Sequence, residues 1–191
     1  MTTATSDQVV EQQVEVKDRV PLWLAVAITV FVSMPFGLWL GKWNFTLWCA
    51  FIVWAEYFAL GAKPAAVKTI LPSFSYAAAL TAVTLWVTQY FSFLPSLVVP
   101  GDLAAALVLA AGVGFMVYSM KWSSTFQEGS LPFFNGISMA LAIYFTGSYP
   151  ELGGTSTAAL WSGVWTILMG VFGCLLGMFN VWILFPKKVE K

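Results

Sequence analysis

The sequence contains no histidine and few charged residues. Charged side chains make up 9% of its 191 residues, whereas a soluble domain usually carries about 25%. This deficit excludes an ordinary water-soluble fold. The absence of histidine removes the commonest ligand of zinc and haem and the commonest proton shuttle at neutral pH. We therefore expect neither a metal site nor a cofactor.

The motifs of soluble chemistry are missing as well. The sequence has no phosphate-binding Gly-rich loop with lysine, no cluster of metal ligands, no Ser/His/Asp set and no basic stripe for nucleic acid. The two cysteines, Cys49 and Cys174, lie far apart inside apolar runs, which is typical of small buried hydrophobic residues. We predict that the protein is not an enzyme and does not bind nucleic acid.

Long apolar runs are instead the main feature of the chain. Hydrophobic residues make up 59% of it and aromatic residues 17%. A helix needs about 20 apolar residues to cross the roughly 30 Å of hydrocarbon in a bilayer. The runs therefore predict an all-α integral membrane protein, with about six transmembrane helices in the lipid bilayer. The predicted spans are Val20–Leu40, Asn44–Leu60, Ile70–Phe93, Leu103–Met120, Leu131–Phe145 and Ala158–Phe185.

The basic residues are distributed unequally between the predicted loops. One side has only Lys42. The other side has Lys17, Arg19, Lys63, Lys68, Lys121, Lys187, Lys188 and Lys191. Because Lys and Arg are retained in the cytoplasm, this bias predicts that both termini are cytoplasmic. The chain then divides into a polar cytoplasmic tail at 1–19, which is not a signal peptide, a single six-helix transmembrane domain at 20–186 and a basic cytoplasmic tail at 187–191.

The second and fifth spans share a pattern that suggests an internal repeat. In Ala55–Gly61 and in Ala142–Gly147, a Tyr-Phe pair ends the span and glycine follows. Each is the second span of a three-span half, and because three is odd, duplicated halves would be inverted. These spans are also the shortest, at 17 and 15 residues, or about 26 and 23 Å. Matched short spans in inverted halves point to a transport site near the midplane.

The start of the fifth span is unusual. Ser130 could cap the helix, and Pro132 is tolerated in a first turn. The Asn135-Gly136 pair one turn later predicts a break or a re-entrant segment.

Glu56 is the only carboxylate well inside a predicted span. A charge in hydrocarbon costs at least a few kcal/mol, so a buried Glu normally faces a cavity, a partner or a proton path. Alternatively, Glu56 reaches the cytoplasmic interface or pairs with Lys63, seven residues further on. Asn135 and Ser138 could line a polar constriction or hold helices together. The candidates for a solute path are Glu56, Tyr57, Asn135, Ser138 and Tyr144.

Glycines in the last span allow close helix contacts. Gly170, Gly173 and Gly177 form a stripe of the kind that lets backbones approach. The stripe predicts packing within one bundle or, alternatively, a subunit interface of a homo-oligomer. Trp161 and Trp165 are weaker candidates for a site, and we assign no role to Asn180.

Three segments resemble the YcdZ-like family of bacterial inner-membrane proteins, a domain of unknown function. They are Tyr57-Phe58-Ala59-x-Gly61, Leu131-Pro132-Phe133-Phe134-x-Gly136 and the Gly170–Gly177 run, and the likeness covers roughly 22–185. The resemblance implies a small multi-span protein of the bacterial inner membrane. The family has no established activity, so it supplies no functional residues. The polar tail and the abundant tryptophan are departures from it.

Three functions can be set against these observations, and the third, an intramembrane enzyme, has the least support. The first is a channel or transporter for a small solute, with the path between the two halves; a passive pore for a small neutral molecule suits the single buried carboxylate better than a multi-ion pump. No solute can be named from the sequence. The second is a non-transporting membrane scaffold or accessory subunit, in which the glycine stripes bind another protein.

Overall fold

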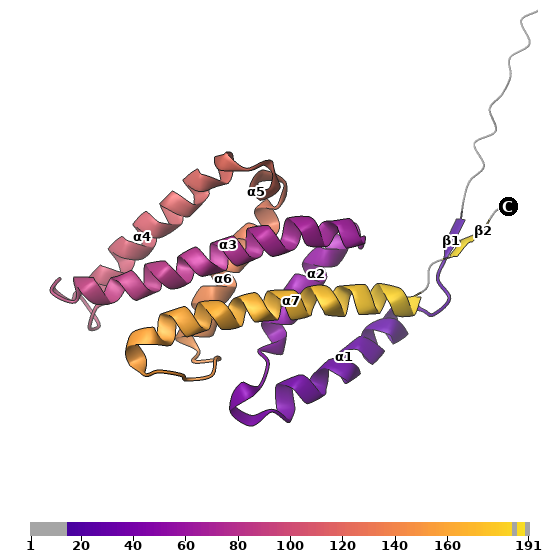
Figure 1. Ribbon diagram of the computed structural model, residues 1–191, viewed down its shortest axis with the longest axis horizontal. Helices are drawn as coiled ribbons and strands as arrows, with labels where there is room; N and C mark the ends of the chain where they lie inside the picture. Colours follow the sequence, from indigo (N-terminus) through magenta and orange to yellow (C-terminus); the bar gives the residue numbers. More distant parts are fainter. Residues whose placement is uncertain (1–14, 185–186, 190–191) are drawn as a thin grey trace, which may run out of the picture.

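The described part of the chain contains six main helices, and each overlaps one predicted span (Figure 1). The computed structural model describes residues 15–184 and 187–189. The connections contain one further short helix, α5 (Ser124–Glu128), and four single-turn 3-10 helices. The main helices are α1 (Leu22–Leu38), α2 (Leu47–Ala59), α3 (Pro64–Thr88), α4 (Asp102–Ser119), α6 (Ser130–Phe145) and α7 (Ala158–Leu184).

The helices differ greatly in length. Three segments are long and apolar enough to cross a membrane: Pro64–Phe91, Asp102–Trp122 and Thr155–Leu184. The helices α1 and α6 are apolar but shorter. With 13 and 16 residues, α2 and α6 are the shortest of the six, or about 20 and 24 Å long. The all-helical prediction is therefore confirmed, whereas six crossings stay a prediction.

The prediction of a break or re-entrant segment in the fifth span is wrong. The helix α6 runs without interruption through Asn135 and Gly136. Gly136 is required for packing, since a Cβ atom at this position would collide with the carbonyl oxygen of Phe74 in α3. Ser130 does not cap the helix either, because the N-cap residue of α6 is Gly129 and Ser130 is the first helical residue.

The start of the third span also differs from the prediction. The helix α3 begins at Pro64, six residues before the predicted start. Proline suits the first helical turn because its missing N–H would have no partner there. Lys68 consequently lies in the helix and not in a loop.

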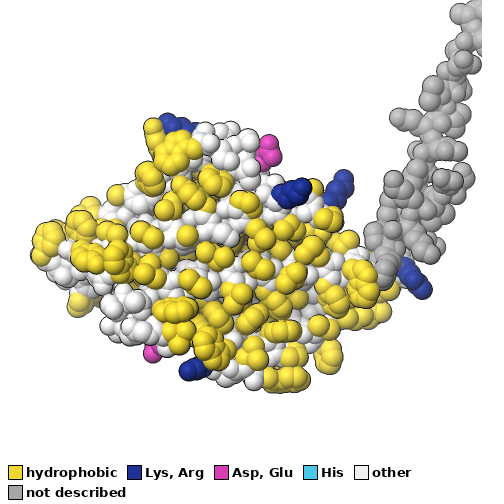
Figure 2. Space-filling view, viewed as in Figure 1, with side chains coloured by type: hydrophobic (Ala, Val, Ile, Leu, Met, Phe, Trp, Pro, Cys, Tyr) yellow, Lys and Arg dark blue, Asp and Glu magenta, His cyan; other side chains and the backbone are white. Residues whose placement is uncertain are grey.

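The six helices form a flat bundle around a central pair, α3 and α7. The short helix α2 packs mainly on α7, and the short helix α6 packs mainly on α3. At the periphery, α1 contacts α7 and α4 contacts α3. In Figure 1, α2 and α6 both lie behind the central pair. Figure 2 has the same view and shows the face formed in front of α2 and α6. Hydrophobic side chains cover much of this face, and the charged side chains lie mainly near its edges.

The two ends of the described chain meet. Strand β1 (Glu15–Lys17) pairs antiparallel with strand β2 (Lys187–Val189), and the amide of Arg19 donates a hydrogen bond to the carbonyl of Leu184 at 3.0 Å. The start of α1 therefore lies beside the end of α7 (Figure 1). The sequence predicted only polar tails in these segments, because three-residue strands leave no readable pattern.

Candidate functional site

A part-buried hydrogen bond joins the two short helices. The Nδ2 atom of Asn135 in α6 donates to the Oε1 atom of Glu56 in α2 at 2.6 Å. Glu56 is 2% exposed although it lies only three residues before the end of α2. The structure thus brings together two of the five predicted path residues, which are 79 positions apart in the sequence.

Among the described residues, the carboxylate of Glu56 has no cationic hydrogen-bond partner. Its second oxygen, Oε2, has no hydrogen-bond partner among the described residues. The expected pairing with Lys63 does not form, because α2 ends at Ala59 and the chain turns through left-handed backbone at Gly61 and Ala62. Lys63 is exposed at the end of this turn.

Tyr57 packs against α7. Its side chain is 1% exposed. A Cβ atom on Gly177 would lie only 2.7 Å from Cγ of Tyr57, so the ring fits against bare backbone. Gly173 is equally close to α2, and Gly170 lies against the ring of Phe74 in α3. All three glycines of the predicted packing stripe therefore lie at contacts within the chain.

The other two predicted path residues lie away from Glu56. Ser138 is exposed, and its hydroxyl donates to the carbonyl of Phe134 in the same helix at 3.0 Å. Tyr144 is half-buried and follows Asn135 by nine residues, or about 14 Å along α6. Ser138 makes no described hydrogen bond with Glu56 or Asn135, and its assignment to a polar constriction stays a prediction.

A second buried polar pair joins α1 and α7. The Nδ2 atom of Asn180 donates to Oγ1 of Thr29 at 2.9 Å, and both side chains are fully buried. Thr29 in turn donates to the carbonyl of Ala25 at 2.8 Å. Asn180, to which the sequence assigned no role, thus helps to hold the peripheral helix α1 on the bundle.

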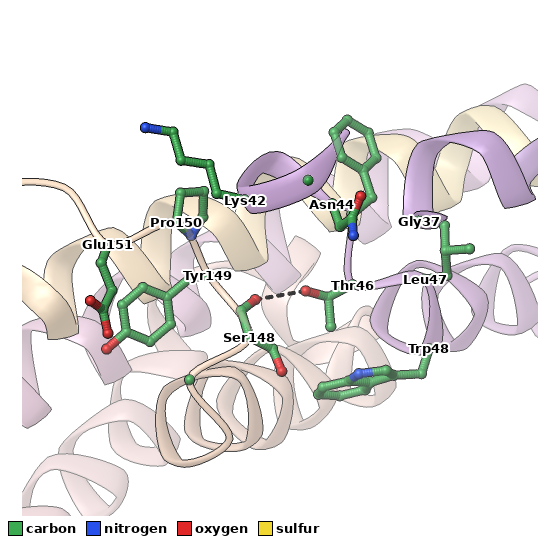
Figure 3. A pocket seen from close by; sticks show the side chains of 13 residues that line it. Gly37, Lys42, Asn44, Thr46, Leu47, Trp48, Ser148, Tyr149, Pro150 and Glu151 are labelled. Atoms are coloured by element: carbon green, nitrogen blue, oxygen red, sulfur yellow. Dashed lines mark hydrogen bonds between the residues drawn. The ribbon is translucent and has the colours of Figure 1, made fainter. Parts of the chain in front are cut away.

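An open cavity of about 720 Å³ lies at the opposite end of α2 and α6 from Glu56. The connection between α1 and α2 forms one wall, and the loop that follows α6 forms the other (Figure 3). Sequence reasoning missed this cavity, because its polar residues come from two loops that are distant in the sequence. Its lining includes Lys42, Asn44, Thr46, Trp48, Ser148, Tyr149 and Glu151.

The cavity, which we call the loop cavity, offers groups of both charges and neutral hydrogen-bonding groups. Lys42 and Glu151 are exposed and carry opposite charges. Burial raises the pKa of the Tyr149 hydroxyl, and Tyr144 and Glu151 add to this rise. Tyr149 therefore stays protonated and can donate a hydrogen bond. Such a lining suits a small polar molecule.

One hydrogen bond ties the two walls of the loop cavity together. The Oγ1 atom of Thr46 donates to the carbonyl of Ser148 at 2.7 Å (Figure 3). We expect Thr46→Val to lower the free energy of unfolding by about 1 kcal/mol, because valine keeps the volume but leaves the Ser148 carbonyl without this donor. Thermal unfolding in detergent measures the change. Thr155→Val, at an exposed site, is the control, and an equal loss there would contradict the assignment.

Searches against protein families, curated proteins and solved structures found no match to this chain. The resemblance to the YcdZ-like family therefore stays a prediction. The class that the described fold defines is an all-helical protein with three helices long and apolar enough to cross a membrane.

Proposed function

We propose that the chain crosses the bacterial inner membrane six times, as two inverted three-helix halves. The paired ends support this topology, because the start of α1 lies beside the end of α7. Ends on the same side of a membrane would imply an even number of crossings. Three long helices alone give an odd number, so one or all three of α1, α2 and α6 must also cross.

The helix contacts support the inverted repeat. If α1, α2 and α3 correspond to α4, α6 and α7, the main contacts of the central helices α3 and α7 have counterparts in the two halves. The contact of α2 with α7 corresponds to that of α6 with α3, and the contact of α1 with α7 corresponds to that of α4 with α3. The symmetry axis would then pass between α3 and α7 and between α2 and α6, where inverted-repeat transporters place their sites.

We propose further that the protein carries a small polar solute along α2 and α6. The observation that carries this proposal is the hydrogen bond between the buried Glu56 and the half-buried Asn135, because polar groups at membrane depth mark solute and ion pathways. The loop cavity would form the outer mouth of this path. Thr46 at the cavity precedes Glu56 by ten residues, or about 15 Å of helix.

The buried state of Glu56 favours a gated path over an open pore. Only 2% of its surface is exposed, so the carboxylate is sealed from water in this conformation. A solute would pass only after α2 and α6 separate. The tight glycine contacts on α3 and α7 would guide such a movement.

Flux through reconstituted protein tests the proposal. Purified protein in liposomes is expected to accelerate entry of at least one solute from a panel of urea, glycerol, alanine and succinate. We expect Glu56→Leu to slow that flux tenfold or more, since loss of one hydrogen bond in a desolvated path costs about 1.4 kcal/mol. Glu128→Gln, at an exposed carboxylate, is the control and should leave flux unchanged. No flux above that of empty liposomes for any solute would overturn the proposal.

The sealed Glu56 also favours the second function, a non-transporting scaffold or accessory subunit. The helix α4 is the least buried of the three long helices, so it offers a surface for another membrane protein. Recovery of a stoichiometric partner from native membranes, together with absence of flux, would favour this function.

A further inference from the structure

Among the described residues, the neighbours of the Glu56 carboxyl group are neutral. We infer that Glu56 is held protonated in the sealed conformation and is the residue that binds and releases a proton, so that solute movement along this path is proton-coupled. The inference rests on the proposed function and adds the coupling ion to it.

The hydrogen bonding of Glu56 favours the protonated form. An ionised carboxylate away from water needs a cation or several donors, and burial without them is very costly. Glu56 receives one hydrogen bond, from the neutral amide of Asn135, and its Oε2 atom has no partner among the described residues. A proton on Oε2 removes the charge without moving any other group.

The surroundings of Glu56 supply no compensating charge. Its electrostatic neighbours in the described part of the chain are the thiol of Cys49 in the same helix and the thiol of Cys174 in α7. Both cysteines are buried and free, so they are neutral. From α6 the neighbour is the amide of Asn135. The nearest lysine in sequence, Lys63, is exposed beyond the end of α2.

The same surroundings favour a proton over a metal cation. Hard cations in proteins are bound by several oxygen atoms. The described hydrogen-bond partner of Glu56 is instead an amide nitrogen. The described residues contain no group of three or more His, Cys, Asp or Glu side chains able to hold a metal ion. A single carboxyl group with one free oxygen suffices for a proton.

The proton cycle balances without any other reactant. When the path opens toward the loop cavity, the carboxylate of Glu56 takes up one proton from water and becomes a neutral carboxylic acid. After the path closes and opens toward the other side, the acid returns the same proton to water. Glu56 lies about 4.5 Å of helix from the end of α2, so a small separation of α2 from α6 would expose it on that side.

Infrared spectroscopy of the full chain in nanodiscs tests the protonation state directly. At neutral pH we expect the carbonyl-stretch band of a protonated carboxylic acid, sensitive to exchange into D2O. The band should disappear in Glu56→Gln, remain in Glu128→Gln and shift in frequency in Asn135→Leu, which removes the hydrogen bond. Absence of the band in the wild type, or its persistence in Glu56→Gln, would overturn the inference.

A pH-sensitive dye inside liposomes tests the coupling. When a gradient of a panel solute drives flux through the wild type, the internal pH should change with it, and Glu56→Gln should remove the pH change. Solute flux without any pH change would overturn the inference and leave the proposed function intact. No flux for any solute would overturn the proposed function itself, and the coupling with it.

Discussion

Replacing Gly173 by leucine should prevent the protein from folding into a stable bundle. A Cβ atom at this position would meet the carbonyl oxygen of Ala50 and would lie 2.7 Å from Cβ of Val53, both in α2. Backbone and β-carbon atoms cannot rotate away. Overpacking of this kind costs about 1–3 kcal/mol for small additions, and leucine adds four carbons against a typical total stability of about 5–15 kcal/mol.

The glycine prediction has a graded series and a matched control. Gly173→Ala should remain folded but lose about 1–3 kcal/mol. Gly114→Ala in α4 is the control, since nothing lies within 4 Å of a Cβ there and alanine is the better helix former by about 1 kcal/mol. The monodisperse fraction on size exclusion and the midpoint of thermal unfolding measure both changes. Equal behaviour of the two alanine variants would contradict the contact of α7 with α2.

Replacing Asn135 by leucine should destabilise the protein chiefly through Glu56. The substitution removes the single donor to the buried carboxyl group, which leaves both of its oxygens without a described partner. An unpaired buried polar group costs about 1–3 kcal/mol. We therefore expect a loss of this size in the wild-type background, measured by chemical unfolding in detergent.

A double-mutant cycle separates this interaction from the change in packing. In a Glu56→Leu background, Asn135→Leu should cost much less, because both polar groups are then gone. Ser138→Leu in the same helix is the control, since Ser138 is exposed and bonds only to its own helix. Additive losses for Glu56→Leu and Asn135→Leu would contradict a direct interaction between them.

The helices were predictable from the sequence, and their exact bounds were not. Apolar runs placed all six main helices, because a chain that faces lipid must satisfy its backbone hydrogen bonds internally. The residues around Asn135-Gly136 were misleading. Local propensity favours a break there, but α3 approaches so closely at Phe74 that only glycine fits, and the helix continues.

The candidate site was predictable only in part. Glu56 stood out because charge is rare in apolar runs, and Asn135 because polar residues are rare in the fifth span. Ser138 had the same signal as Asn135, but its side chain is exposed. The sequence could not separate the two residues, because helical spacing alone does not say which side of a helix meets its neighbours. The loop cavity left no signal, because it forms only where two distant loops meet.

The sequence by itself determined that this protein is helical and apolar, that α2 and α6 are short, and that Glu56 is the carboxylate placed within an apolar helix. Each of these follows from local composition and length. Only the tertiary structure decided that Glu56 meets Asn135 and not Lys63, that the glycine stripe packs within the chain and that the two ends pair. Those contacts depend on how helices cross, and crossing is set by the close approach of backbones at glycines far apart in the sequence.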